Sequence, residues 1–129
     1  MRKLICIRMV KITIEYGANV LARRALIVGI DDYNNFQPLQ DCVNDANQIG
    51  ELLSKNDNGS VNYDCKLNTS PGSERITQKF LSEKWMELFA NFEGDILFYF
   101  SDHGYLTDIG GYIVTQEGGF GDIGLKIDD

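Results

Sequence analysis

The stretch GDILFYFSDHG, residues 94–104, decides the fold expected for this chain of 129 residues. Its apolar run from Ile96 to Phe100 has the length of a strand and is typical of a central strand covered on both faces. Polar residues return after the run, and His103 is the only histidine in the chain. Because α/β proteins place their chemistry at the carboxyl ends of such strands, His103 is a candidate site residue where this strand is expected to end.

Strand and helix patterns alternate before that stretch. The expected elements are a buried strand at 25–30, a helix at 43–53, a short strand at 63–67 and a helix at 76–92. Right-handed crossovers between such elements give an α/β fold with a parallel sheet. Two short extended pieces, at 112–115 and 123–126, are expected after the histidine.

Polar residues stand where the two helices are expected to begin. Asp41 or Asn44 is expected to cap the first helix, and Ser73 the second. Residues 1–22 fit the alternation of strands and helices poorly, although 10–15 alternate enough to form a short strand. Residues 1–22 are therefore interpreted as an N-terminal extension or an added edge strand.

Composition and charge narrow the range of functions. A net charge of −7 and an isoelectric point near 4.6 argue against binding of nucleic acid or of anionic membranes. No segment reaches the ~20 apolar residues of a membrane span, and charged residues interrupt the apolar start before it can form a signal peptide. Cys6, Cys42 and Cys65 are too few and too far apart for a disulfide scaffold or a zinc site. These observations favour a cytoplasmic protein without a metal site.

Two blocks of the sequence resemble the caspase and metacaspase family of cysteine peptidases, peptidase family C14. One block is the apolar strand with Ser-x-His-Gly at 101–104, and the other is RRALIVGIDDY at 23–33 followed by PLQDCVNDANQIGELL at 38–53. The resemblance covers 23–129 and implies a caspase-like three-layer α/β/α sandwich with a mainly parallel sheet, C-terminally incomplete. It implies an endopeptidase domain for protein or peptide substrates that needs no cofactor, with activation by calcium left open.

Five residues are expected at the candidate site, three of them from the resemblance and two from their place at the end of a strand. His103 matches the general base that assists a thiol, and Gly104 matches the glycine whose N–H helps to hold the oxyanion. Asp45 matches a position that lines the pocket for the residue before the scissile bond, where an acid selects Arg or Lys. Asp31 and Asp32 end the first strand and are expected to border the same site. For the three aspartates, exposed acids of a loop or helix are the alternative interpretation.

Two features depart from the family pattern. The nucleophilic cysteine of the family lies downstream of the histidine, but none of the 26 residues after His103 is a cysteine. Cys6, Cys42 and Cys65 are instead expected to be small buried residues. Asp102 stands where metacaspase-like members usually have glycine, and its carboxylate is expected to face solvent. The 129-residue chain alone is therefore expected to be inactive.

Three functions stay open on the sequence. The leading one is part of a caspase-like cysteine endopeptidase, paired with a missing C-terminal part or with another subunit that brings the nucleophile. The second is a noncatalytic caspase-like module that binds partners through an open sheet edge. The third is a phospho-receiver-like domain, in which Asp31 and Asp32 would bind Mg²⁺ beside a phospho-accepting aspartate. The third is disfavoured, because the expected strand at 63–67 does not end in an aspartate.

Overall fold

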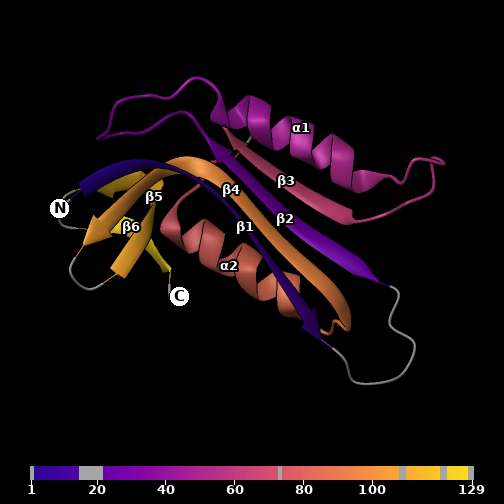
Figure 1. Cartoon of the computed structure of the whole chain (residues 1–129). Helices are drawn as coiled ribbons and strands as arrows, with labels where there is room; N and C mark the ends of the chain where they lie inside the picture. Colours follow the sequence, from indigo (N-terminus) through magenta and orange to yellow (C-terminus); the bar gives the residue numbers. More distant parts are fainter. Residues whose placement is uncertain (1, 15–21, 73, 108–109, 120–121, 128–129) are drawn as a thin grey trace.

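A computed structural model of the protein describes residues 2–14, 22–72, 74–107, 110–119 and 122–127. The elements, in chain order, are β1 (Arg2–Ile14), β2 (Arg23–Ile30), α1 (Cys42–Ser54), β3 (Asp64–Ser70), α2 (Gln78–Phe89), β4 (Gly94–Thr107), β5 (Gly110–Gly119) and β6 (Asp122–Ile127). The described strands form one sheet of six, which α1 and α2 cover from opposite sides (Figure 1). The expected α/β fold class is confirmed.

The sheet combines parallel and antiparallel pairs. β2 pairs in parallel with β3 on one side and with β4 on the other, as the alternation of strands and helices predicts. β5 and β6 extend the sheet as antiparallel strands, and β1 pairs antiparallel with β4. β4 thus lies at the centre, with β2 and then β5 along one edge and β1 along the other (Figure 1).

Alternation along the central strands gives each face of the sheet its own apolar core. The cluster on the α2 face contains Leu26, Val28, Leu81, Leu88, Phe98 and Phe100. The cluster on the α1 face contains Ala25, Ile27, Ala46, Leu97 and Tyr99. Both faces are covered, which explains the unbroken apolar runs in β2 and β4. The same alternation places Ser101 and His103 on the α1 face of β4, and Asp102 on the α2 face.

β4 does not end at His103, where the return of polar residues predicts its end. It continues to Thr107, because strands on both edges keep pairing with it. β1 pairs with β4 as far as Leu106, and β5 pairs with it from Gly104 onward. His103 therefore lies inside a paired strand and not in a loop, and β1 pairs with it along one edge.

β1 is much longer than the short strand expected at 10–15. It pairs with β4 in unbroken antiparallel register, from Arg2 opposite Leu106 to Ile14 opposite Gly94. The alternation within 10–15 accounts for only part of this strand, and the pairing with β4 accounts for the rest. β1 has four basic residues and no acidic residue, whereas the whole chain has a net charge of −7.

The carboxyl end of β1 is attached to β4 through Asp95. Thr13 Oγ1 donates a hydrogen bond to Asp95 Oδ1 (2.9 Å), and Lys11 Nζ lies 3.4 Å from Asp95 Oδ2. Arg23 Nε of β2 lies 3.6 Å from the same oxygen. The hydrogen bond from Thr13, followed by the charges of Lys11 and Arg23, lowers the pKa of Asp95. Asp95 thus links β1 to β2 across the end of β4.

The first helix is capped by an aspartate distant in sequence, not by Asp41 or Asn44. The side chain of Asp41 makes no capping hydrogen bond, and Asn44 lies inside α1. The carboxylate of Asp31, which follows β2, accepts hydrogen bonds from the backbone N–H groups of Cys42 (2.9 Å) and Val43 (3.2 Å). A local sequence pattern does not reveal this cap, because the loop between β2 and α1 has to fold back to form it.

The second helix begins later and ends earlier than the range 76–92. Its N-cap is Thr77, whose Oγ1 accepts a hydrogen bond from the N–H of Phe80 (3.1 Å), and α2 ends at Phe89. Ser73 is therefore not the cap, and Ser73 itself lies outside the described residues. Neither of the two helices in the described part of the chain is long and apolar enough to cross a membrane.

Candidate active site

The loop between β2 and α1 folds around His103. Gln37 in this loop places its backbone oxygen 2.7 Å from His103 Nε2. A carbonyl oxygen only accepts, so in the neutral imidazole Nε2 carries the proton and donates it, and Nδ1 carries the lone pair. The rings of Tyr33 and Phe36 flank the imidazole, with centroids 4.7 and 6.3 Å away. The histidine is thus held in one tautomer and one orientation, as a general base requires.

Tyr33 also holds the backbone of His103. Its hydroxyl accepts a hydrogen bond from the N–H of His103 (2.9 Å) and donates one to the carbonyl oxygen of Ile30 (2.8 Å). Burial, followed by the charge of Asp102, raises the pKa of this phenol. The hydroxyl therefore stays protonated at neutral pH and serves both hydrogen bonds.

Asp45 and Ser101 meet on the same face of the sheet as His103. Asp45 lies in the first turn of α1, and its Oδ2 accepts a hydrogen bond from Ser101 Oγ at 3.4 Å. Ser101 is buried and stands two residues before His103 in β4, so the two side chains share a face. Asp45 is half-buried. A carboxylate in this position suits a guanidinium or ammonium group.

A glycine in β2 allows α1 to approach the sheet closely. A Cβ atom at Gly29 would collide with the carbonyl oxygen of Cys42 and with the Cβ of Ala46. Without that Cβ, the first turn of α1 lies directly on β2. This close approach is what lets Asp45 reach Ser101 on the neighbouring strand.

Asp31 and Asp32 have different surroundings at the end of β2. The carboxylate of Asp31 is half-buried and engaged with the N-terminus of α1, whereas Asp32 is exposed. Asp31 therefore anchors both ends of the loop that contains Gln37, since its carbonyl oxygen also accepts from the N–H of Leu39 (2.9 Å). Contact of either aspartate with a substrate stays a prediction.

Asp102 does not face solvent, so that expectation is wrong. Its side chain is fully buried, and neither carboxylate oxygen has a hydrogen-bond partner among the described residues. Burial raises the pKa of Asp102 well above its ordinary value of 3.8. The physical reason is the length of β4: because the strand continues past His103, alternation turns Asp102 onto the covered α2 face.

Gly104 directs its N–H toward β1. Successive N–H groups along a strand point to alternate edges. The N–H of His103 points to Tyr33, on the edge shared with β2 and β5, so the N–H of Gly104 points to the opposite edge. There β1 places Leu4 opposite Gly104. An oxyanion would reach this donor from the edge that β1 covers.

Cys42 and Cys65, the cysteines whose side chains the structure describes, are poor nucleophiles for His103. Burial raises the pKa of the Cys42 thiol to about 11, so it is protonated at neutral pH. Cys65 lies in β3, which β2 separates from β4. Cys6 of β1 is paired with Asp102 and not with His103. Within the described residues, no group of three or more His, Cys, Asp or Glu side chains is arranged to hold a metal ion.

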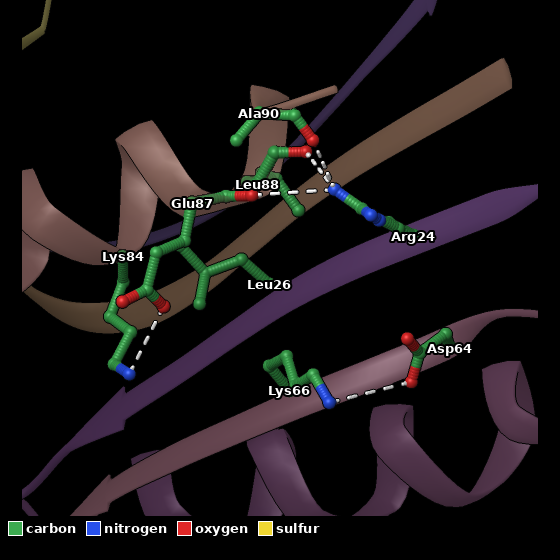
Figure 2. Close-up of a pocket in the computed structure, with 8 residues that line it drawn as sticks. All are labelled: Arg24, Leu26, Asp64, Lys66, Lys84, Glu87, Leu88 and Ala90. Carbon is green, nitrogen blue, oxygen red and sulfur yellow. Dashed lines mark hydrogen bonds and ion pairs between the residues drawn. The ribbon is translucent and has the colours of Figure 1, made fainter. Parts of the chain in front are cut away.

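A cavity of about 390 Å³ lies at the opposite end of β2, between β2, β3 and the last turn of α2 (Figure 2). Arg24 of β2 donates from Nη1 to three carbonyl oxygens there, those of Glu87, Leu88 and Ala90, at 3.1 to 3.3 Å. Lys66 and Lys84, which also line the cavity, form ion pairs with acids of their own elements (Figure 2). The cations are already engaged within the protein, so Arg24 acts here as the C-terminal anchor of α2.

Three groups that contribute to the candidate site were not among the five residues expected from the sequence. They are Ser101, Tyr33 and the carbonyl of Gln37. Ser101 had a signal, because it belongs to the Ser-x-His-Gly motif, and Tyr33 ends the quoted block at 23–33. Gln37 had none, because it acts through its backbone.

A comparison with protein families agrees with this geometry. The family model of the caspase domain, peptidase C14, matches residues 22–120. The match covers more than half of the chain and includes β2, α1 and the whole of β4 with His103, so the chain belongs to this family. No curated protein and no solved structure matched the chain. The class defined by fold, site and family is that of a caspase-like peptidase domain.

Proposed function

We propose that this domain supplies the histidine part of a cysteine endopeptidase site. The observation that carries the proposal is the hydrogen bond from His103 Nε2 to the carbonyl oxygen of Gln37, which makes Nδ1 the basic nitrogen. His103 takes the proton of a thiol and later gives it to the departing amine. The thiol comes from sequence outside these 129 residues, because Cys42 and Cys65 are poorly suited to the role.

The proposed reaction is acyl transfer. The thiolate attacks the carbonyl carbon of the scissile bond, and the N–H of Gly104 helps to hold the resulting oxyanion once β1 has left this edge of β4. The carbon–nitrogen bond then breaks as the imidazolium of His103 protonates the leaving amine, which leaves a thioester. Water, deprotonated by His103, attacks the thioester carbon; the carbon–sulfur bond breaks, the second product leaves as a carboxylic acid, and the imidazolium of His103 returns its proton to the thiolate.

Asp45 supports a preference for Arg or Lys before the scissile bond. Its half-buried carboxylate beside Ser101 would pair with a cation and would repel an acidic side chain. No arginine falls within 38–46 to receive an acidic side chain instead. Asp31 supports the same pocket indirectly, by fixing where α1 begins.

The test begins with the source locus beyond codon 129. If the reading frame continues through a helix and an apolar strand into Asp-x-Cys, the continuous protein should cleave peptides after Arg or Lys. His103→Ala should then lower kcat about 10²–10⁴-fold. Asp45→Asn should lower kcat/KM for Arg peptides about a hundredfold, whereas Asp57→Asn in the exposed turn after α1 should not. A stop codon directly after Asp129, or full activity in His103→Ala, would overturn the proposal.

A second function, a noncatalytic module that binds a partner protein, is supported by β1. This strand covers the edge of β4 toward which the N–H of Gly104 points. If the source gene stops after Asp129, we expect the chain to bind a partner without hydrolysing it. In that case His103→Ala should leave the affinity for the partner within about twofold of the unchanged chain.

A further inference from the structure

β4 changes its neighbour on one edge beside the histidine. β2 pairs with β4 as far as Ser101, and β5 begins to pair with it at Gly104. Asp102 and His103 therefore fall in a gap between two neighbouring strands. Backbone groups in a buried gap need acceptors and donors from elsewhere, because leaving them unpaired is costly.

The hydroxyl of Tyr33 fills this gap. It accepts from the N–H of His103 (2.9 Å) and donates to the carbonyl oxygen of Ile30 (2.8 Å), so it joins the end of β2 to β4 where direct pairing has stopped. Tyr33 is only 8% exposed, and its ring lies 4.7 Å from the imidazole, centroid to centroid. One side chain thus contacts both the backbone and the ring of the histidine.

The loop that contains Tyr33 is held from a second side. The N–H of Asn34 donates to the carbonyl oxygen of Gln116 in β5 (2.9 Å), and Asn35 Nδ2 donates to the carbonyl oxygen of Gly118 (3.0 Å). These hydrogen bonds hold the loop against β5 and so restrict the positions that the Tyr33 ring can adopt. Tyr33 is therefore a fixed support for the histidine.

We propose that Tyr33 is a positioning residue for His103. The hydroxyl of Tyr33 fixes the position of the histidine backbone relative to β2, so that Nε2 meets the carbonyl of Gln37. Its importance for catalysis rests on the proposed function, but the positioning itself does not. Loss of the hydroxyl leaves the N–H of His103 and the carbonyl of Ile30 without this partner, while a phenylalanine ring still fills the space. The imidazole then exchanges between its two tautomers.

The test compares Tyr33→Phe with Tyr63→Phe in the chain as it stands. Tyr63 is also a buried tyrosine, but it belongs to the cluster on the α1 face and lies beside Arg23. Because His103 is the only histidine, its ring nitrogens give unambiguous NMR signals. In Tyr33→Phe we expect a mixture of the two tautomers and exchange of the His103 amide hydrogen about 10- to 100-fold faster, relative to the amide of Ile27. In Tyr63→Phe both readouts should match the unchanged protein within about twofold.

A Tyr33→Phe protein that keeps the single tautomer and the slow amide exchange would overturn the inference. If this variant does not fold, the unchanged protein decides the question. Its His103 amide should be as protected as that of Ile27 and should show a nuclear Overhauser contact to a slowly exchanging Tyr33 hydroxyl proton. An unprotected amide without that contact would also overturn the inference. These readouts do not involve peptide cleavage, so a failure of the peptidase proposal leaves them unaffected.

Discussion

Asp102 brings an ionisable group into the core one residue before the histidine. Its carboxyl group is fully buried and has no hydrogen-bond partner in the described part of the chain. An ionised carboxylate there loses its hydration without compensation, so folding favours the protonated acid and the pKa is raised. The stabilising effect of the proton is complete below the unfolded-state pKa. It is lost as the pH rises from that value toward the higher folded-state pKa.

We expect Asp102→Asn to remove this dependence on pH. The free energy of unfolding of the unchanged protein should fall as the pH rises from about 4 to about 8, whereas that of the variant should stay nearly level. At about pH 8 the variant should be more stable by about 1–3 kcal/mol, because it has no carboxyl group that must take up a proton or be buried as a charge on folding. Urea denaturation across this pH range measures both effects.

The matched control for this change is Asp57→Asn. It removes the same charge from an exposed turn, so its free energy of unfolding should fall with pH as in the unchanged protein. An Asp102→Asn protein with the same fall would show that the buried carboxyl is not its source.

Single residues were predictable from sequence where their chemistry depends on side chain and motif. The pair His103 and Gly104 stood out because a polar motif follows an apolar strand, and Asp45 stood out because it matches a position of the family in the block 38–53. The carbonyl of Gln37 did not, because every residue has a carbonyl and only the path of the loop decides which one reaches the imidazole. The burial of Asp102 depends on strands that pair with β4 beyond the motif.

At the scale of elements, the start of α1 connects the sheet to the candidate site. Asp31 accepts from two N–H groups of α1, and its own N–H donates to the carbonyl oxygen of Ser70 at the end of β3 (2.8 Å). A carboxylate at a helix N-terminus is favoured by these hydrogen bonds and by the helix dipole. Asp31 therefore sets the position of α1 on the sheet, and α1 carries Asp45.

We expect Asp31→Ala to lower the free energy of unfolding by about 1–2 kcal/mol, because two N–H groups lose their acceptor. Asp41→Ala should change it by less than about 0.5 kcal/mol, since the Asp41 side chain makes no capping hydrogen bond. Chemical denaturation of the two variants gives the comparison. Equal losses in both would contradict the assignment of Asp31 as the cap.

For most elements the sequence predicts whether a helix or a strand forms, but it predicts less well the residues at which the element begins and ends. Apolar periodicity predicted β2, α1 and α2 close to where they lie, because each has a clear pattern within its own residues, whereas the short extended pieces expected at 112–115 and 123–126 cover only parts of β5 and β6. The ends depend on partners from elsewhere in the chain. Asp31 defines the start of α1 from another element, and β1 and β5 extend β4 past His103.

At the scale of the whole molecule, β1 closes the sheet beside the candidate site. It runs along the edge of β4 as far as the position opposite Leu106 (Figure 1). Without it, that edge would present unpaired backbone groups, which recruit other strands. Only a weak signal, at 10–15, indicated this strand in the sequence, because its pairing partner β4 lies far from it along the chain.

Removal of residues 1–14 should therefore make the protein associate with itself. We expect the shortened chain to form dimers or larger species at micromolar concentration, where the full chain does not. Its free energy of unfolding should fall by more than about 2 kcal/mol, because a full row of cross-strand pairs is lost. Analytical ultracentrifugation and urea denaturation measure the two effects.

Lys11→Gln is the control for the truncation. It removes the ion pair with Asp95 but keeps the strand, so its free energy of unfolding should change by less than about 1 kcal/mol and it should not associate. A shortened chain that sediments like the full chain would show that β1 does not protect the edge.

The pairing of β1 with β4 also imposes an order on folding. β1 leaves the ribosome before β2 and β3, yet its partner β4 follows both of them in the chain. Closing so long a loop carries a high entropic cost, so β2 and β3 can pair before β1 finds its place. In every newly made molecule the edge beside Gly104 is thus closed late. Any other strand present during that interval competes with β1 for the same position.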